Sequence, residues 1–277
     1  MLQPSTISRF LKNTAKVLVC IYLLILVALM FFEEVLIFPA PNVADDQWQQ
    51  QLQQEDVRFT SADGTELHGW YFPVADPEQS NGTLLYSHGN GDCVAYLGPL
   101  ANSLRNQYGL NVLVYDYRGY GKSEGKPTGA GVLADGEAAR QWLAERENIP
   151  IDEIILMGRS LGGGVAVHLA ANGGARGLIL ESTFTRLSDV AARQFPWLPV
   201  RLVMRTRIDS IDKIGSYNGP LLQSHGNADS LIPFEQGKAL FEAASGSKTF
   251  VELDGLNHND HQTIEYYEKL GEFLNDI

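Results

Sequence analysis

A serine between two glycines carries the strongest chemical signal in the sequence. Ser160 lies in the pentapeptide 158–162 (GRSLG), between a strand expected over 153–157 and a helix expected over 161–172. A serine on such a tight turn needs small residues on both sides, because larger side chains would strike the strand or the helix. The turn also places the Leu161 N–H at the positive end of the helix, where it can stabilise an oxyanion. The pattern predicts Ser160 as a nucleophile and Leu161 as an oxyanion donor.

A serine hydroxyl is a weak nucleophile at neutral pH, so it needs a histidine base that is oriented by a carboxylate. Asp229 comes just after a strand expected over 221–224, and His258 comes just after a strand expected over 248–253. The chain order Ser, Asp, His is the order expected for a triad built on this kind of turn. We therefore predict that Asp229 is the acid and His258 the base. The alternatives left open are Asp254 and Glu235 for the acid and His225 and His261 for the base.

A second oxyanion donor is expected in the loop after the strand over 83–87. The residues 88–92 (HGNGD) include two glycines, which let backbone N–H groups approach a substrate oxygen closely. The predicted donor is the N–H of Asn90, acting together with that of Leu161. His88 is interpreted as a residue that holds this loop.

These residues lie within an alternation of short β-branched runs and longer helical patterns. The alternation predicts an α/β fold, with a mostly parallel sheet and helices on both faces in one large domain. Eight strands are expected, over 57–60, 67–73, 83–87, 111–115, 153–157, 177–180, 221–224 and 248–253. Helices are expected over 97–107, 131–146, 161–172, 233–244 and 262–275. The less regular segment 186–216 is the only room for a lid, so a minimal lid is expected.

The N-terminal segment predicts a transmembrane helix. Residues 17–32 are uncharged and largely aliphatic, and a cleaved signal peptide and a buried helix are the alternatives. Three bases and no acid precede the run, whereas acids follow it, which puts the N-terminus in the cytoplasm and the catalytic domain on the non-cytoplasmic side. The expected parts are a basic cytoplasmic N-terminus over 1–16, a transmembrane anchor over 17–38, a tether over 39–55 and a catalytic domain over 56–277.

Composition narrows the choice of partners. The formal charge of -12 and the pI near 4.9 argue against a surface that neutralises nucleic-acid phosphates, so no nucleic-acid partner is expected. Cys20 falls inside the apolar run, so no disulfide with Cys93 is expected. The oligomeric state does not follow from the sequence.

Six motifs resemble, in order, those of the α/β-hydrolase superfamily. The resemblance is closest to its single-pass, membrane-anchored branch related to protein-depalmitoylases, whose N-terminus is also similar to residues 36–39 (LIFP). It implies an α/β-hydrolase fold over 56–277, a serine triad, and no cofactor or metal. The motifs lie at 87–91 (SHGNG), 116–121 (DYRGYG), 158–162 (GRSLG), 181–185 (ESTFT), 225–229 (HGNAD) and 258–260 (HND).

The expected reaction is cleavage of a carboxylic ester or thioester through an acyl-enzyme. The substrate would be a small-molecule or lipid-derived acyl compound, since a membrane anchor favours lipid-derived groups. An acyl pocket is expected from Phe184, Phe195, Trp197 and Leu198, and simple core packing is the alternative for these side chains. A serine peptidase of the same fold and a non-catalytic membrane scaffold are the rival functions.

Overall fold

An eight-stranded sheet forms the centre of the computed structural model, which describes residues 4–49 and 52–277. The strand order is β1-β2-β4-β3-β5-β6-β7-β8; β2 pairs antiparallel with β1 and β4, and all later neighbours are parallel. This confirms the predicted mostly parallel sheet and the number of strands. The strands are β1 Glu55–Thr60, β2 Glu66–Phe72, β3 Gly82–Ser87, β4 Leu110–Tyr115, β5 Ile154–Arg159, β6 Gly177–Glu181, β7 Leu221–Gly226 and β8 Lys248–Leu253.

The burial of each strand follows its place in the sheet. All six residues of the central strand β4 are buried, as expected where helices cover both faces of a parallel sheet. In the edge strand β1 burial alternates, and Val57 and Phe59 are the residues that face the core. The sheet therefore separates two apolar layers.

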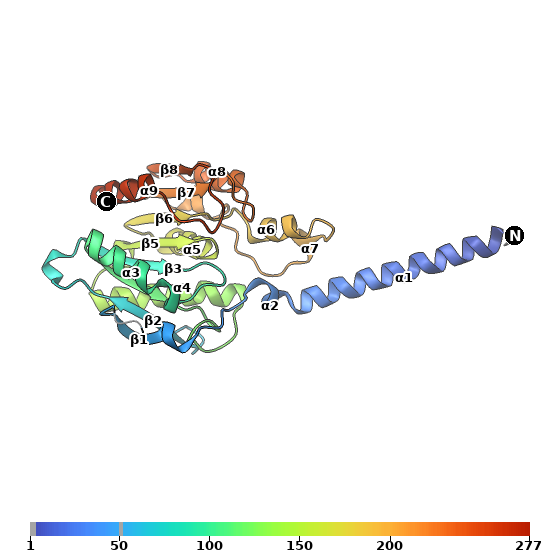
Figure 1. Cartoon of the computed structure of the whole chain (residues 1–277), viewed down its shortest axis with the longest axis horizontal. Helices are drawn as coiled ribbons and strands as arrows, with labels where there is room; N and C mark the ends of the chain where they lie inside the picture. The colour runs from blue at the N-terminus through green and yellow to red at the C-terminus, as the bar shows by residue number, and fades with distance from the viewer. Residues whose placement is uncertain (1–3, 50–51) are drawn as a thin grey trace.

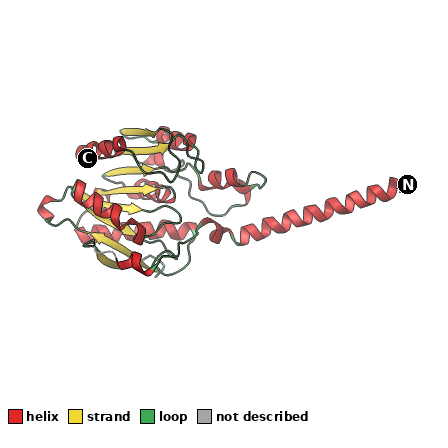
Figure 2. Ribbon diagram, in the orientation of Figure 1, coloured by secondary structure: helices red, strands yellow, loops and turns green. Residues whose placement is uncertain are grey.

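Helices cover both faces of the sheet (Figure 2). The layer packed with α4, α5 and α8 contains Val132, Val165 and Leu240, and the layer packed with α3 and α9 contains Leu104 and Leu270. This confirms the predicted helices on both faces. Their bounds are α3 Val94–Tyr108, α4 Gly129–Glu147, α5 Leu161–Gly173, α8 Phe234–Ala243 and α9 Ile264–Asp276, with short 3-10 turns at η2 Pro77–Gln79 and η3 Ile151–Glu153.

The irregular segment after β6 forms a small lid. It contains α6 Leu187–Gln194 and α7 Val200–Val203, followed by the 3-10 turn η4 Ile214–Ser216. Figure 1 shows α6 and α7 projecting from the domain on the side from which α1 leaves it. The segment expected to form a minimal lid thus folds into two short helices, and we call α6, α7 and the residues between and just after them the lid.

One long helix precedes the domain. It is α1 Pro4–Phe31, followed by α2 Glu33–Ile37 and the 3-10 turn η1 Asp45–Gln49. Ser8–Phe31 is long and apolar enough to cross a membrane, with a mean hydropathy of 2.5. The helix starts earlier and breaks earlier than the expected span 17–38, and the breaking residue Phe32 has φ -96° and ψ 11°. Residues 1–3 of the expected basic segment and residues 50–51 of the expected tether lie outside the described residues.

Candidate active site

Ser160 occupies a strained turn between β5 and α5. Its backbone has φ 52° and ψ -115°, a region that residues with side chains rarely adopt. The Ser160 N–H donates to the Glu181 carbonyl at 2.9 Å, and its carbonyl accepts from Thr183 Oγ1 at 2.7 Å. These bonds to β6 and the residues after it hold the turn in place.

The two glycines of the pentapeptide are required by close backbone approach. A Cβ on Gly158 would strike the backbone of Gly162, and a Cβ on Gly162 would strike the Ser87 carbonyl at the end of β3. Glycine at both positions therefore lets β5, α5 and β3 meet around the serine. Small residues were expected at these two positions for the same steric reason.

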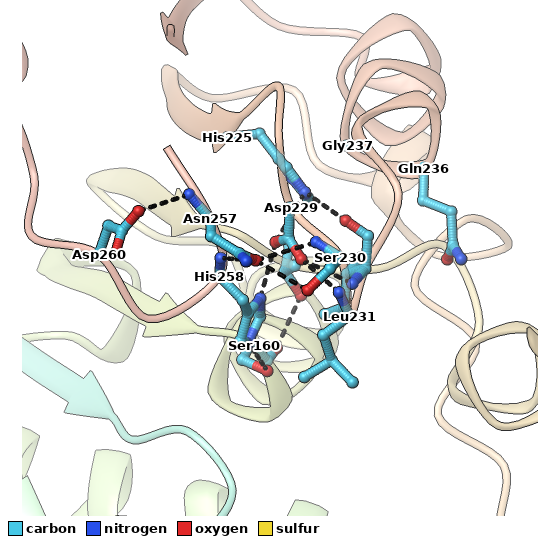
Figure 3. Close-up of polar contacts among 12 residues, drawn as sticks. Ser160, His225, Asp229, Ser230, Leu231, Gln236, Gly237, Asn257, His258 and Asp260 are labelled. Carbon is cyan, nitrogen blue, oxygen red and sulfur yellow. Dashed lines mark hydrogen bonds and ion pairs between the residues drawn. The ribbon is translucent and has the colours of Figure 1, made fainter. Parts of the chain in front are cut away.

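Three side chains from loops at the carboxyl edge of the sheet meet at this turn (Figure 3). Ser160 Oγ lies 3.1 Å from His258 Nε2, and His258 Nδ1 lies 2.7 Å from Asp229 Oδ2. The side chain of Asp229 is fully buried, and that of His258 is 8% exposed. The arrangement can transfer the hydroxyl proton of Ser160 to an imidazole that a carboxylate holds in one orientation.

Asp229 is surrounded by donors. Its Oδ1 accepts from the N–H groups of Leu231 at 2.9 Å and Ile232 at 2.8 Å. The buried His225 donates from Nε2 to the Ile232 carbonyl at 2.9 Å and lies 3.3 Å from Asp229 Oδ2. Burial raises the pKa of Asp229, but the hydrogen bonds of His225, His258 and Ile232 outweigh burial, so the pKa lies well below its usual range. The carboxylate is therefore ionised when it faces His258.

The loop that carries His258 is held by residues that sequence analysis did not single out. Arg159, next to the serine, donates from Nη2 to the His258 carbonyl at 2.7 Å. Asn257 Oδ1 accepts from the His258 N–H at 2.7 Å and from the Ser230 N–H at 2.9 Å. Asn257 thus joins the loop of the base to the loop of the acid. In the sequence, only the position of Asn257 directly before His258 could have indicated this role.

Leu161 and the loop that carries Asn90 lie beside the serine. Leu161 is the first residue of α5, so its N–H has no partner within the helix. Gly89 packs so closely that a Cβ on it would lie 3.7 Å from Ser160 Cβ. The side chain of the next residue, Asn90, donates to the Ile37 carbonyl and accepts from the Tyr120 hydroxyl at 2.6 Å. The loop after β3 therefore lies against the nucleophile, and its predicted role as oxyanion hole stays a prediction.

The alternative triad residues lie elsewhere. His261 and Asp254 are exposed, and Asp254 accepts from the surface residue Asn227 at 2.9 Å. Glu235 belongs to the first turn of α8. His225 is close to Asp229 but bonds to a backbone carbonyl, as described above. The geometry thus brings Asp229 and His258, and not the alternatives, to Ser160.

The four residues expected to form an acyl pocket lie in three environments. Phe184 is 1% exposed and belongs to the core layer beside α5. Phe195 and Leu198 line a groove between the lid and α1, and Trp197 is 56% exposed at the lid surface. An acyl pocket made by all four stays a prediction.

A second histidine and carboxylate cluster has a structural role. His68 lies between Asp116, at 3.2 Å, and Asp56, at 3.1 Å, and Asp116 Oδ1 also accepts from the Val94 N–H at the start of α3. The cluster therefore joins β1, β2 and α3 beneath the loop after β3. Within residues 4–49 and 52–277, no three His, Cys, Asp or Glu side chains are grouped to hold a metal ion.

Comparison with known proteins agrees with this fold. Residues 78–215 match a family model described as serine aminopeptidase, S33. The chain is 37% identical over 210 residues to uncharacterized protein Rv2307c of Mycobacterium tuberculosis, which covers 76% of this chain and 74% of the relative. It is also 32% identical to the α/β-hydrolase domain-containing protein WAV2 of Arabidopsis thaliana, over 74% of this chain and 72% of the relative.

Among solved structures, the chain is similar to the Pyrococcus furiosus esterase Pf2001. The match has a TM-score of 0.67 at 25% identity and covers 86% of this chain and 96% of the esterase. The chain therefore belongs to the α/β-hydrolase family. Its fold and its relatives support hydrolase activity.

Proposed function

We propose that this protein is a membrane-anchored serine hydrolase that cleaves a carboxylic ester or thioester through an acyl-enzyme. The observation that carries the proposal is the continuous contact from Ser160 Oγ through the His258 imidazole to the Asp229 carboxylate. A strained turn that presents the serine, and a buried and ionised Asp229, add to it. The structural similarity to the Pyrococcus furiosus esterase Pf2001 supports an ester as the substrate.

In the proposed reaction, His258 Nε2 takes the proton of Ser160 as the serine oxygen attacks the carbonyl carbon. The N–H groups of Leu161 and Asn90 stabilise the oxyanion. As the tetrahedral intermediate collapses, His258 gives the proton to the leaving alcohol or thiol. Water, deprotonated by the same imidazole, then attacks the acyl-enzyme and releases the carboxylic acid and the free serine. Asp229 keeps Nδ1 protonated and stabilises the imidazolium.

The proposed anchor is α1, with the N-terminus in the cytoplasm and the catalytic domain on the other side. Support comes from the apolar span Ser8–Phe31 and from the bases Arg9, Lys12 and Lys16, which precede the most apolar part. The charges that follow the span are Glu33 and Glu34. An enzyme held in this way would meet substrates in or near the bilayer.

A serine peptidase is the second candidate, because the matching family model is described as an aminopeptidase. The same three residues could attack an amide. Turnover of aminoacyl amides at rates similar to those of esters would favour the peptidase, whereas turnover of esters alone would favour the esterase. A non-catalytic scaffold would turn over neither.

Covalent labelling by a fluorophosphonate tests the proposal directly. Membrane fractions with the wild type and with Ser160→Ala are treated with the probe, and labelled protein is measured. Labelling confined to the wild type is expected, because only an activated serine reacts with such a probe. A folded wild type that does not react would contradict the proposal. Reaction with esters of increasing acyl length then tests the lipid-derived substrate.

A further inference from the structure

The end of α1 packs against the lid along one apolar face. Leu26, Leu29 and Met30 are partly buried, whereas Val27 and Ala28 are exposed, so one stripe of the helix meets the domain. On the other side of the groove lie residues of α6, α7 and the turn between them, namely Ala191, Phe195, Leu198, Val200, Val203 and Met204. The lid is therefore in contact with the last turns of the helix proposed as the membrane anchor.

A buried carboxylate fixes this contact. Glu33 is 7% exposed, and its side chain accepts from the N–H groups of Arg205 at 3.0 Å and Thr206 at 2.6 Å. In return, Arg205 Nη2 donates to the Met30 carbonyl at the end of α1, at 2.7 Å. The segment that leaves the lid is thus joined to the point where α1 ends.

The tip of the lid reaches back along α1. The Tyr22 hydroxyl donates to the Trp197 carbonyl at 3.1 Å. Tyr22 comes nine residues before Phe31, and at about 1.5 Å per residue that corresponds to about 14 Å along the helix. Because the hydrocarbon core of a bilayer is about 30 Å thick, the tip would lie inside the leaflet that holds the C-terminal half of α1 if α1 crosses the membrane.

The exposed surface of the lid has the composition of a membrane-contacting surface. Leu202 is 84% exposed, and Phe195 and Trp197 are 45% and 56% exposed. Phe195 shares its groove with Leu36 of α2, and Phe31, Phe32 and Val35 at the end of α1 and the start of α2 are exposed as well.

The charge of the lid is opposite to that of the whole chain. Residues 186–207 contain five arginines and one aspartate in a chain whose net charge is -12. Arg201, Arg205 and Arg207 are exposed; Arg201 pairs with Asp189 and Arg205 with Glu33, and Arg207 has no acidic partner among the described residues. Cations beside a membrane helix attract lipid phosphates, and aromatic side chains favour the interface between acyl chains and headgroups.

We propose that the lid α6–α7 is a second membrane contact, which inserts into the leaflet where the C-terminal half of α1 lies. Phe195, Trp197 and Leu202 contact acyl chains, and the arginines around α7 contact phosphate groups of phospholipids. The inference rests on the proposed anchoring by α1. It places the lid of the candidate active site inside the bilayer surface.

Fluorescence quenching by brominated lipids tests this contact in the full chain. The protein is reconstituted in vesicles of phosphatidylcholine and phosphatidylglycerol, with or without bromine on the acyl chains. The chain has four tryptophans, Trp48, Trp70, Trp142 and Trp197, and none lies in α1, so quenching reports on the tether and the domain. Bromine on the acyl chains is expected to quench the wild type, and Trp197→Phe is expected to lose most of this quenching.

The matched control is Trp142→Phe, since Trp142 packs against Phe59 and Tyr71 on the sheet side of α4 and should not contribute. Adding Leu202→Trp to the Trp197→Phe variant is expected to restore quenching at the other exposed site. Equal quenching in the wild type and Trp197→Phe, with none gained from Leu202→Trp, would overturn the proposal. Such a result would indicate that a second copy of this chain or another protein, and not lipid, covers this surface.

Alkaline carbonate extraction tests whether α1 anchors the protein, independently of whether the lid contacts lipid. Wild type that carbonate releases from the vesicles would contradict both the anchor and the lid contact. Wild type that resists extraction while Trp197 stays unquenched would contradict the lid contact only. Fluorophosphonate labelling of the same vesicles reports independently on Ser160.

Discussion

His258 Nδ1 lies 2.7 Å from Asp229 Oδ2, and the carboxylate has no exposed side-chain surface. The short contact joins two loops that are separated in the chain by α8 and β8. Because Asp229 is also held by the N–H groups of Leu231 and Ile232, it cannot turn away from the imidazole without losing those bonds. The carboxylate therefore sets which nitrogen of His258 faces Ser160.

Replacing Asp229 by asparagine should stop turnover while preserving the fold. An amide has nearly the same shape, but its NH2 group can present a hydrogen to Nδ1 and favour the wrong tautomer, a change that costs about 10⁴-fold in kcat in a serine-protease triad. The measurement is ester hydrolysis by Asp229→Asn, with thermal unfolding as the check of folding. Asp254→Asn is the matched control, because Asp254 is exposed on the loop after β8. Near-native activity of Asp229→Asn would refute the assignment of the acid.

The lowered pKa of Asp229 predicts how stability depends on pH. Hydrogen bonds from His225 and His258 outweigh burial and depress the pKa in the folded state, whereas the unfolded chain titrates near about 3.9. The ionised group therefore stabilises the fold fully above that ordinary pKa, and this contribution is lost as the pH falls towards the folded-state pKa.

The measurement is the difference in melting temperature between the wild type and Asp229→Asn at a series of pH values. The difference should be constant above about pH 5 and shrink at lower pH. Burial raises the pKa of Glu181, but Glu181 is present in both proteins, so its contribution cancels in the difference. A difference that grows on acidification would contradict the ionised state of Asp229.

The sequence predicted the strands and the three residues that meet, because local chemistry determines both. Buried parallel strands appear as short apolar runs, and a serine between glycines on a turn after such a run can adopt few other conformations. Asp229 and His258 each follow a strand directly, so their loops had to reach the same edge of the sheet as Ser160.

The contacts that hold the site could not be predicted in the same way. Arg159 bonds to the carbonyl of His258, 99 residues away, and Glu33 bonds to the N–H of Arg205, 172 residues away. Neither contact leaves a periodic pattern in the sequence. The surroundings of Phe195 and Leu198, two residues of the expected acyl pocket, could not be predicted either, because both side chains lie in a groove beside α1. The start of α1 was missed because Arg and Lys are themselves good helix formers.

Removing the side chain of Asn90 should slow catalysis without preventing covalent labelling. That side chain joins the loop after β3 to the Ile37 carbonyl and to the Tyr120 hydroxyl. In Asn90→Ala the loop loses both bonds, so the predicted oxyanion N–H is less well positioned, and a fall in kcat of about tenfold is expected, less than the loss of a whole donor.

The comparison variant is Tyr120→Phe, which removes only one of the two bonds and should lower kcat less. Both variants should still react with a fluorophosphonate, because Ser160 and His258 are intact. An Asn90→Ala protein with wild-type kcat would contradict a positioning role for this side chain.

Replacing Glu33 should release the lid from α1. Its pKa is lowered because, although burial opposes ionisation, the N–H groups of Arg205 and Thr206 donate to the carboxylate. In Glu33→Gln at neutral pH the charge is lost, and the NH2 group in place of Oε2 faces the N–H and the guanidinium of Arg205. A hydrogen bond to a charged group contributes about 1.5–3 kcal/mol, so the local opening of this segment should increase about tenfold or more.

Limited trypsin digestion measures this opening, since Arg201, Arg205 and Arg207 are exposed beside the contact. Cleavage in 201–207 should be about tenfold faster in Glu33→Gln, because proteolysis follows the population of the open form when closing is fast. Glu34→Gln is the matched control, as Glu34 is the exposed neighbour in α2. If both variants are cleaved at the wild-type rate, Glu33 does not hold the lid. Faster cleavage of Glu33→Gln alone would establish that Glu33, at the start of α2, fixes the position of the lid.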